Sequence, residues 1–226
     1  MPILADIPFE LDADALARQL HADREPDDAR ELAAMVEQAR QTGRPKALYR
    51  EVFIDARGGD TVTMGGVTFT SRVLRRNLDD VHRVFAYVAT CGDELDGIGI
   101  DPGDFVRGYW LDAIKAELLR AARRHLGEHL DRTHALGRTS SMNPGSGDAT
   151  VWPIEQQRLL FSLLGDVEAS IGVRLTDSFL MVPNKSISGL HYPTQRDFRS
   201  CQLCHREDCP SRRAPFDHAL WESMQP

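Results

Sequence analysis

Three of the four cysteines in this chain lie within nine residues near its C-terminus. Cys201, Cys204 and Cys209 follow the spacing C-x2-C-x4-C, with Pro210 directly after the last of them. A C-x2-C pair lets two thiolates converge on one metal ion, and a third thiolate five residues later can close the other side. Clustered thiolates without a metal repel one another unless they stay protonated. The spacing therefore predicts a metal site; the alternative is a group of redox-sensitive thiols.

The residue types suggest which metal to expect. Three cysteines and a following proline suit a [4Fe–4S] cluster whose fourth iron site is filled from elsewhere or left open. A structural zinc ion needs four ligands, and the sequence offers Cys91 or His205 as the fourth. A lone cysteine such as Cys91 is also typical of a small buried residue. We therefore expect a [4Fe–4S] cluster, with zinc as the alternative.

The elements that must position this segment mix helices with strands. Caps and apolar spacing predict helices over 13–21, from Pro26 to about 42, over 104–130, from Pro153 to 164 and over 216–223. Strand formers and turn signals predict strands near 48–54, 61–64, 67–70, 81–90, 174–182 and 187–192. Residues 137–150 are rich in Gly, Ser and Pro and are expected to form a loop. This mixture indicates the α+β class.

The overall charge excludes some classes of function. The 226 residues include 27 Lys and Arg against 34 Asp and Glu, which gives a formal net charge of −7. That balance argues against a nucleic-acid partner, which requires a basic face. No apolar run has the length of a membrane-spanning helix, and no secretory signal is visible, so we expect a cytoplasmic protein without a membrane partner. The basic face formed by Arg120, Arg123 and Arg124 is expected to be solvated surface.

A second motif precedes the cysteines. Residues 175–183 read LTDSFLMVP, and residues 186–189 read SISG. In order and spacing these segments resemble the activation domain of cobalamin-dependent methionine synthase, which carries L-T-E-S-x-x-M-x-P followed by S-x-S-G. Asn143-Pro144-Gly145 falls where that family has R-x-x-P-G-Y. The resemblance covers roughly residues 84–195, and the cysteine cluster resembles the ending of stand-alone relatives of that domain.

The resemblance implies a fold, a ligand and a partner. The expected fold is a twisted antiparallel sheet with flanking helices, to which the cysteine segment adds a C-terminal metal knuckle. Domains of this family bind S-adenosylmethionine (AdoMet) and present its methyl group to a reduced corrinoid, which rescues oxidised cobalamin. The cobalamin would be carried by the partner, a corrinoid-binding protein or corrinoid methyltransferase. A homo-oligomer is left open.

The resemblance also places candidate cofactor-binding residues, with two departures. Ser141 stands at the family's arginine position and Ser146 at its tyrosine position, so the usual carboxylate partner and aromatic ring are missing there. Arg138 lies three residues before Ser141 and is a candidate substitute. The alternatives are a weakened AdoMet site, a site for another ligand, or a purely reductive role. The full set of candidates is Arg138, Ser141, Pro144, Gly145, Ser146, Asp177, Ser178, Ser186 and Ser188.

Two functions follow as hypotheses. The first is a reactivation factor for a corrinoid-dependent methyltransferase, in which the cysteine-bound cluster supports reduction of the cobalt and AdoMet methylates it. The second is a non-catalytic, zinc-stabilised module that binds a corrinoid protein or a nucleotide-like ligand. We expect three parts: N-terminal helices with a small β-meander over 1–80, an activation-domain-like core over 81–199, and a metal-binding tail over 200–226.

Overall fold

The computed structural model describes residues 1–148, 150–209 and 212–224. Its α-helices are α1 (Ala13–Leu20), α2 (Pro26–Thr42), α3 (Arg72–Asn77), α4 (Phe105–His134), α5 (Gln157–Leu164), α6 (Val167–Ile171) and α7 (His218–Met224). Its strands are β1 (Ile3–Leu4), β2 (Lys46–Arg57), β3 (Thr61–Met64), β4 (Val67–Thr70), β5 (Arg83–Thr90), β6 (Thr139–Met142), β7 (Arg174–Leu175), β8 (Met181–Val182) and β9 (Ser186–Pro193). Short 3-10 turns include η2 (Glu94–Gly97), η3 (Ile154–Gln156) and η4 (Ser200–Leu203).

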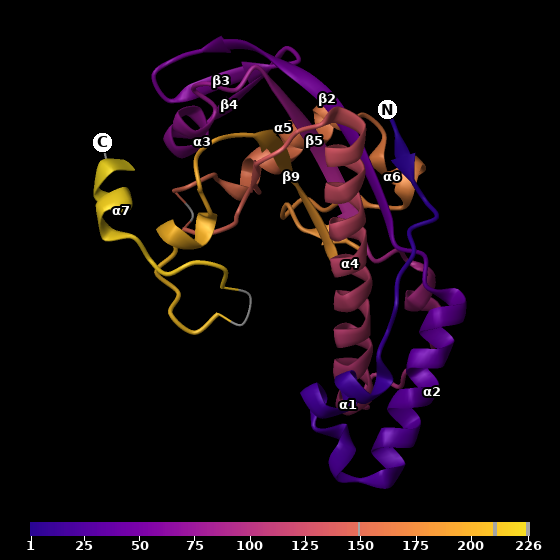
Figure 1. The fold of residues 1–226 in the computed structure, drawn as a ribbon. Coiled ribbons are helices and arrows are strands. Elements are labelled where there is room, and N and C mark those ends of the chain that lie inside the picture. Colours follow the sequence, from indigo (N-terminus) through magenta and orange to yellow (C-terminus); the bar gives the residue numbers. More distant parts are fainter. Residues whose placement is uncertain (149, 210–211, 225–226) are drawn as a thin grey trace.

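The main sheet is antiparallel throughout and runs in the order β4-β3-β2-β5-β9-β6, with β1 paired to β2 (Figure 1). Strand β9 lies between β5 and β6, so it brings together two segments that are far apart in the sequence. Tyr87 of β5 is opposite Gly189 of β9, and Ser141 of β6 is opposite His191. The expected α+β class, with an antiparallel sheet and flanking helices, is confirmed.

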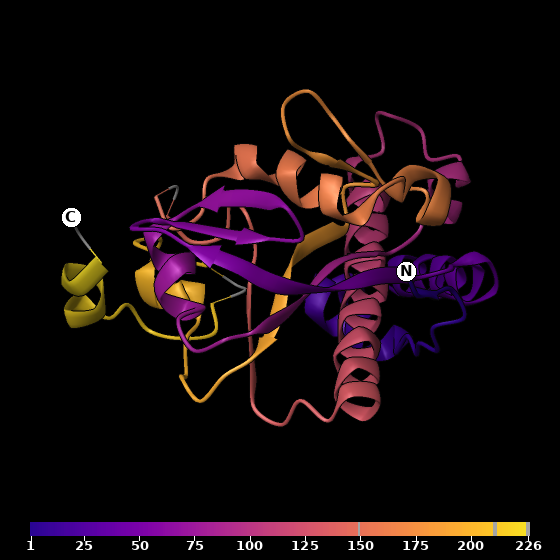
Figure 2. The same ribbon diagram turned by 90° about the horizontal axis from the view of Figure 1, so that it is seen from above.

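Helices cover both faces of the central strands, which explains why β5 is apolar along nearly its whole length. Side chains of β5 that point to one face pack against the C-terminal half of α4, where Leu126 and Leu130 are buried. Side chains on the other face join a larger core with α5 and α6. These two helices lie along one side of the sheet in Figure 2. A strand buried on both faces reads as a continuous apolar run rather than an alternating one.

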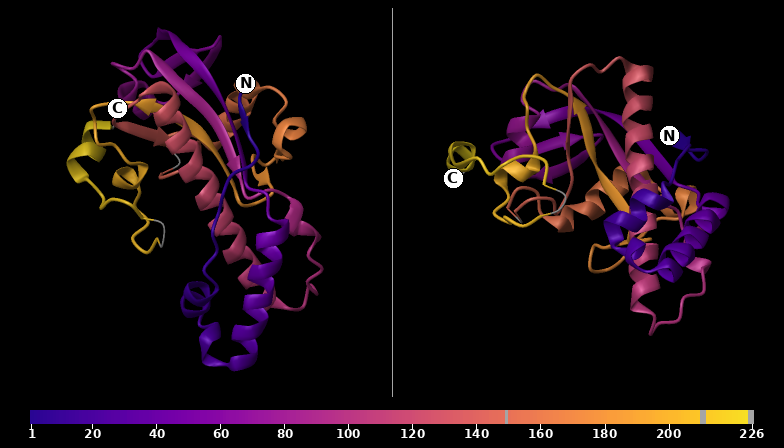
Figure 3. Two further views of the ribbon diagram at one scale, coloured as in Figure 1. Left: turned by 45° about the vertical axis from the view of Figure 1, so that its right-hand side comes forward. Right: turned by 60° about the horizontal axis from the view of Figure 1, so that its bottom comes forward.

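A helical arm extends away from the sheet. Helices α1 and α2 pack on the N-terminal half of α4, around Trp110, Ile114 and Leu118 (Figure 3). Their boundaries follow the sequence signals, since Asp12 caps α1, Pro26 begins α2 and Asp104 caps α4. Within the described ranges, no helix has both the length and the apolar character needed to cross a membrane.

The structure corrects two predictions about local structure. Residues 137–150, expected to form a loop, include strand β6, because its Thr-Ser-Ser-Met segment pairs with the edge of β9. Residues 174–182, expected to form one strand, instead form the two-residue strands β7 and β8 with a turn between them. Helices α3 and α6 were not predicted; both begin at a capping side chain, Ser71 and Asp166 respectively.

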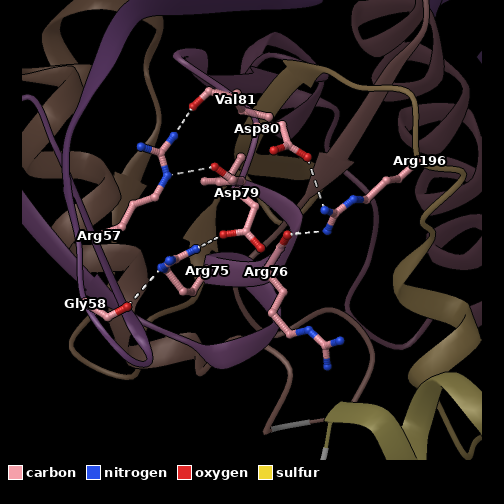
Figure 4. A network of polar contacts seen from close by, with 9 residues as sticks. Arg57, Gly58, Arg75, Arg76, Asp79, Asp80, Val81 and Arg196 are labelled. Atoms are coloured by element: carbon pink, nitrogen blue, oxygen red, sulfur yellow. Dashed lines mark hydrogen bonds and ion pairs between the residues drawn. The ribbon is translucent and has the colours of Figure 1, made fainter.

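A network of arginine contacts fixes the segment that leads into the cysteines (Figure 4). Arg196, which follows β9, donates to the carbonyl of Arg76 at 2.6 Å and lies 3.2 Å from the Asp80 carboxylate. Arg57 and Arg75 tie the end of β2 to the same helix α3 through the carbonyls of Leu78 and Gly58. The C-terminal segment therefore leaves the sheet at a defined position beside α3.

Candidate functional site

Two of the segments that resemble the family, residues 143–145 and residues 186–189, meet at the side chain of Asn143. The amide nitrogen of its side chain donates to the Tyr87 hydroxyl at 2.8 Å and to the Ser188 carbonyl at 2.6 Å. This approach requires glycine at position 189, because a Cβ there would lie 2.5 Å from the Met142 carbonyl oxygen and closer still to the Asn143 amide. The glycine of the SISG segment thus lets β6 and the residues after it lie tightly against β9.

The loop after Asn143 is also built around glycines. Gly145 has a φ of +74°, which L-residues rarely adopt, and a Cβ there would press on Ile154 at 3.1 Å. Its N–H donates to the Trp152 carbonyl at 2.8 Å, and the Ser146 N–H donates to the Asn143 carbonyl at 3.1 Å. These contacts hold the Pro144–Ser146 turn in one conformation at the end of β6.

A cleft opens between this turn, β9 and the middle of α4. It consists of two adjoining hollows of about 310 and 460 Å³, a size typical of small-molecule sites. Arg123, Ser141, His191 and Arg213 line both hollows and so mark their junction. Ser146 and Cys201 line the larger hollow. The cleft therefore combines residues of the motif segment, the long helix and the cysteine tail.

The lining of the cleft is strongly basic. Arg120, Arg123 and Arg124 of α4 and Arg213 of the tail all border the smaller hollow. This corrects the expectation that the α4 arginines form only solvated surface. Among the described lining residues the one acidic side chain is Asp197, which is 3.5 Å from Arg138 and 3.9 Å from Arg199. A basic concave surface of this kind attracts an anionic ligand.

Burial shifts the titration of two other lining groups. It lowers the pKa of His191, an effect that the nearby Asp131 carboxylate partly opposes, so the imidazole is neutral at pH 7. It also raises the pKa of the Tyr87 hydroxyl, which therefore stays protonated. Both rings present neutral hydrogen-bonding groups, and the positive charge of the cleft comes from its arginines.

The cysteine segment is folded around Arg212. The guanidinium of Arg212 donates to the carbonyls of Cys201, Cys204 and Ala214 at 3.0–3.1 Å and also to that of Arg206. The next residue, Arg213, donates its backbone N–H to the Cys201 sulfur at 3.4 Å. Consecutive arginines thus have different environments: one holds the loop and the other lines the cleft.

The structure does not gather the predicted metal ligands. The cysteines are free thiols, and within the described part of the chain no group of three or more His, Cys, Asp or Glu side chains is close enough to hold a metal ion. The metal knuckle at Cys201, Cys204 and Cys209 stays a prediction from spacing; Pro210 lies outside the described residues.

The two candidate fourth ligands lie in other surroundings. Cys91 is buried with the helical arm, where burial raises the pKa of its thiol to about 12. His205 packs its ring against Phe216 and Trp221, with centroid distances of 4.5 and 4.6 Å. Its Nδ1 is 3.9 Å from the Asp148 carboxylate. The aromatic contacts of His205 anchor the tail, whereas Cys91 belongs to the core of the helical arm.

The predicted cofactor-binding residues divide into two groups. Ser141 and Ser146 line the cleft, Pro144 and Gly145 shape its turn, and Arg138 lies beside it, paired with Asp197. Asp177 and Ser178 are exposed in the turn between β7 and β8, where Asp177 is 3.6 Å from Arg158 of α5. Because α5 covers the face of the sheet opposite the C-terminal half of α4, that turn is not brought to the cleft.

Ser186 and Ser188 also do not line the cleft. The Ser186 hydroxyl donates to the Pro183 carbonyl at 2.7 Å and lies 2.8 Å from the Thr90 hydroxyl, so it closes a turn. Ser188 is buried, and strand alternation directs it to the face opposite His191, which does line the cleft. Arg123 and Arg213 were not predicted as ligand-binding residues, because nothing in the local sequence marks these two distant positions as neighbours in space.

Comparisons with known proteins agree with this architecture. Residues 128–208 match the family model of the vitamin B12 dependent methionine synthase activation domain. Among solved structures, the chain is similar to the MetH reactivation domain bound to AdoHcy, with a TM-score of 0.54 and 17% sequence identity over 84% of this chain and 70% of the other. No curated protein matches the chain significantly. The resemblance found in the sequence is therefore confirmed where it overlaps the family match, over residues 128–195, and the fold is confirmed over most of the chain.

The matched segment does not include the whole cleft. It contains β6, β9 and the turn at Asn143, together with Cys201 and Cys204. Arg123 precedes the matched segment, and Arg213 follows it. The part of the cleft that lies in the matched segment is thus formed by β6, β9 and the Asn143 turn. The positive charges of Arg123 and Arg213 lie outside that segment.

Proposed function

We propose that this protein is a reactivation factor for a corrinoid-dependent methyltransferase and holds AdoMet in the basic cleft. The observation that carries the proposal is the cleft itself. It lies at the end of β6, a strand of the segment that matches the activation-domain family, and its size and polar lining suit a nucleoside-like ligand. The solved relative with the same fold is bound to AdoHcy, the product of methyl donation by AdoMet.

The proposed reaction is a methyl transfer to cobalt. The S–CH3 bond of AdoMet breaks while a Co–C bond forms, and cobalt(I) supplies the electron pair. The products are AdoHcy and a methylcobalt(III) corrinoid. A cobalt(II) corrinoid must first gain one electron from a low-potential donor, because only cobalt(I) is nucleophilic enough to attack the methyl group. The corrinoid arrives with the partner protein and is the substrate here.

The contribution of this chain is to bind and orient the sulfonium ligand. Ser141 and Ser146 offer hydroxyl groups in the larger hollow, and the rigid Pro144–Ser146 turn fixes their position. Holding the methyl donor in line with the incoming cobalt lowers the entropic part of the barrier. Neutral His191 adds a hydrogen-bonding group without adding charge near the sulfonium.

The cysteine segment adds a predicted metal site to the proposal, and this site is tested separately from AdoMet binding. Its spacing supports a [4Fe–4S] cluster, or zinc as the alternative, at Cys201, Cys204 and Cys209. A [4Fe–4S] cluster at this place would supply one-electron redox chemistry beside the cleft. Because the described residues do not gather the three thiols, the proposed methyl transfer assigns no step to a metal.

One observation favours a second candidate function. Ser141 and Ser146 replace the arginine and tyrosine that the family pattern has at these positions. A module without catalytic activity, which binds a corrinoid protein or a nucleotide-like ligand through the same cleft, would tolerate both changes. This alternative predicts ligand or partner binding without methyl transfer.

A methyl-transfer assay separates the two functions. Free cobalamin is reduced to cob(I)alamin with titanium(III) citrate and mixed with AdoMet labelled in its methyl group, with and without the protein. Labelled methylcobalamin should form faster with the wild-type chain than without protein, and a Ser141→Trp variant, which fills the cleft, should lose that gain. Wild-type protein that binds AdoHcy but gives no gain in rate would favour the binding module.

A further inference from the structure

The junction of the two hollows brings together arginines from distant parts of the chain. Arg123 lies in the middle of α4 and is half-buried, whereas Arg213 follows the cysteine segment and is exposed. Both border both hollows, together with Ser141 and His191. The two residues therefore border the same space, one carried by the core and the other by the tail.

Within the part of the chain that the structure describes, these two arginines lack a carboxylate partner. Among the described residues, neither guanidinium forms an ion pair, whereas Arg120 pairs with Glu117 and Arg199 lies 3.9 Å from Asp197. Both side chains border the same two hollows, so the cleft holds two like charges near each other. Like charges held near each other in a partly buried cleft are stabilised when an anion lies between them.

The contrast with Arg212 shows that this placement is not a general property of the tail. The Arg212 guanidinium donates its hydrogen bonds to backbone carbonyls of the cysteine segment and thereby shapes the loop. Arg213 leaves its guanidinium free of such contacts among the described residues, and its backbone N–H instead contacts the Cys201 sulfur. The fold of the segment thus directs one arginine inward to the loop and the next one to the cleft.

We infer that Arg123 and Arg213 form a subsite for the anionic group of the ligand, a carboxylate or a phosphate, at the junction of the two hollows. Guanidinium groups bind both anions through paired N–H donors, which makes two converging arginines a specific receptor. This inference rests on the proposed function for the identity of the ligand, since AdoMet and AdoHcy carry an α-carboxylate. It assigns to the helix and the tail the charge that Ser141 does not supply.

Calorimetric titration with three probes tests the subsite. AdoHcy carries the carboxylate, 5′-methylthioadenosine has the same nucleoside and thioether without it, and inorganic phosphate is an anion alone. The proteins are the wild type, Arg123→Gln and Arg213→Gln, with Arg132→Gln as the control. Arg132 is an exposed arginine on the same helix that borders neither hollow. Thermal unfolding of each variant checks that it is folded.

Loss of one charged hydrogen-bonding partner should weaken AdoHcy binding about tenfold or more in Arg123→Gln and in Arg213→Gln. The control should bind AdoHcy as the wild type does, and all proteins should bind 5′-methylthioadenosine alike. If the two variants bind AdoHcy as tightly as the wild type, the subsite is wrong although the proposed AdoMet site stands.

A wild-type chain that binds no AdoHcy overturns the AdoMet part of the proposed function, and the phosphate arm then decides on the subsite. Phosphate binding that is lost in both arginine variants supports an anion subsite for a phosphorylated ligand. Absence of both AdoHcy and phosphate binding overturns the subsite as well.

Discussion

The two walls of the cleft are built in different ways. The wall formed by β6, β9 and the Asn143 turn is held by strand pairing and by contacts that leave no room for a side chain at Gly189. The wall formed by the tail is held by Arg212, which binds several carbonyls of the segment, and by aromatic contacts of His205. The first wall lies in the segment that matches the family, and Arg213 of the second lies beyond it. The rigid wall therefore comes from the segment that matches the family, whereas the positive charge of Arg213 comes from the tail beyond it.

The largest effect on the rigid wall should come from Gly189→Ala. The added Cβ collides with the Met142 carbonyl and the Asn143 amide, and overpacking of this kind costs about 1–3 kcal/mol of unfolding free energy. Calorimetric melting measures it. Gly59→Ala is the matched control, because a Cβ there meets nothing within 4 Å. Equal melting temperatures for Gly189→Ala and the wild type would contradict the tight approach at Asn143.

The tail wall should respond to Arg212→Ala with local loosening. Removing the guanidinium leaves its carbonyl partners to water, so limited proteolysis should cut the 200–213 segment several times faster while the global melting temperature changes little. Arg213→Ala should leave the cleavage rate unchanged, because its guanidinium makes no hydrogen bond to the described residues of the loop. Equal cleavage rates for Arg212→Ala and the wild type would show that other contacts shape the loop.

Metal analysis of anaerobically purified protein sharpens the account of the cysteine segment. Cys204→Ser should lower the bound metal to background, because it removes one of three predicted thiolate ligands. Cys91→Ser should retain the wild-type metal content, since Cys91 is buried with the helical arm. If the wild type and Cys204→Ser bind equal amounts of metal, the predicted metal site at these cysteines is wrong. Broad visible absorption would identify an iron–sulfur cluster, and a colourless protein with zinc would identify the alternative.

The smallest expected effect is a pH dependence from His191. Its folded-state pKa is lowered by burial, so below pH about 6.5 the unfolded chain binds a proton that the folded chain resists. Stability is therefore greatest above that pH and falls as the pH drops. Denaturant unfolding at pH 7.5 and 5.5 should show a smaller loss for His191→Gln than for the wild type. His129, whose pKa burial also lowers, contributes in both proteins. An identical loss in the variant would contradict a half-buried His191 that is neutral at pH 7.

Local signals in the sequence were sufficient for much of the fold. The caps Asp12 and Asp104, the proline at position 26 and the glycine turn at 65–66 place helices and hairpin strands as the structure has them. Strand β6 could not be recognised, because its Thr-Ser-Ser-Met segment becomes a strand only through pairing with β9. Tertiary pairing overrides such weak local preferences.

The candidate site was partly predictable. The resemblance led to Ser141, Ser146 and the turn between them, which line or shape the cleft. It also led to Asp177, Ser178, Ser186 and Ser188, which lie elsewhere, because order along the chain does not say which side of a sheet a residue faces. Arg123 reads as a solvated helix residue and Arg213 as a tail charge; only the folded chain brings them together.

A crystal structure of the protein grown with saturating AdoHcy would locate the ligand. We expect AdoHcy in the cleft between α4 and the Asn143 turn, with its carboxylate within hydrogen-bond distance of the Arg123 and Arg213 guanidinium groups. An empty cleft, or AdoHcy bound instead at the exposed turn that contains Asp177, would contradict this expectation.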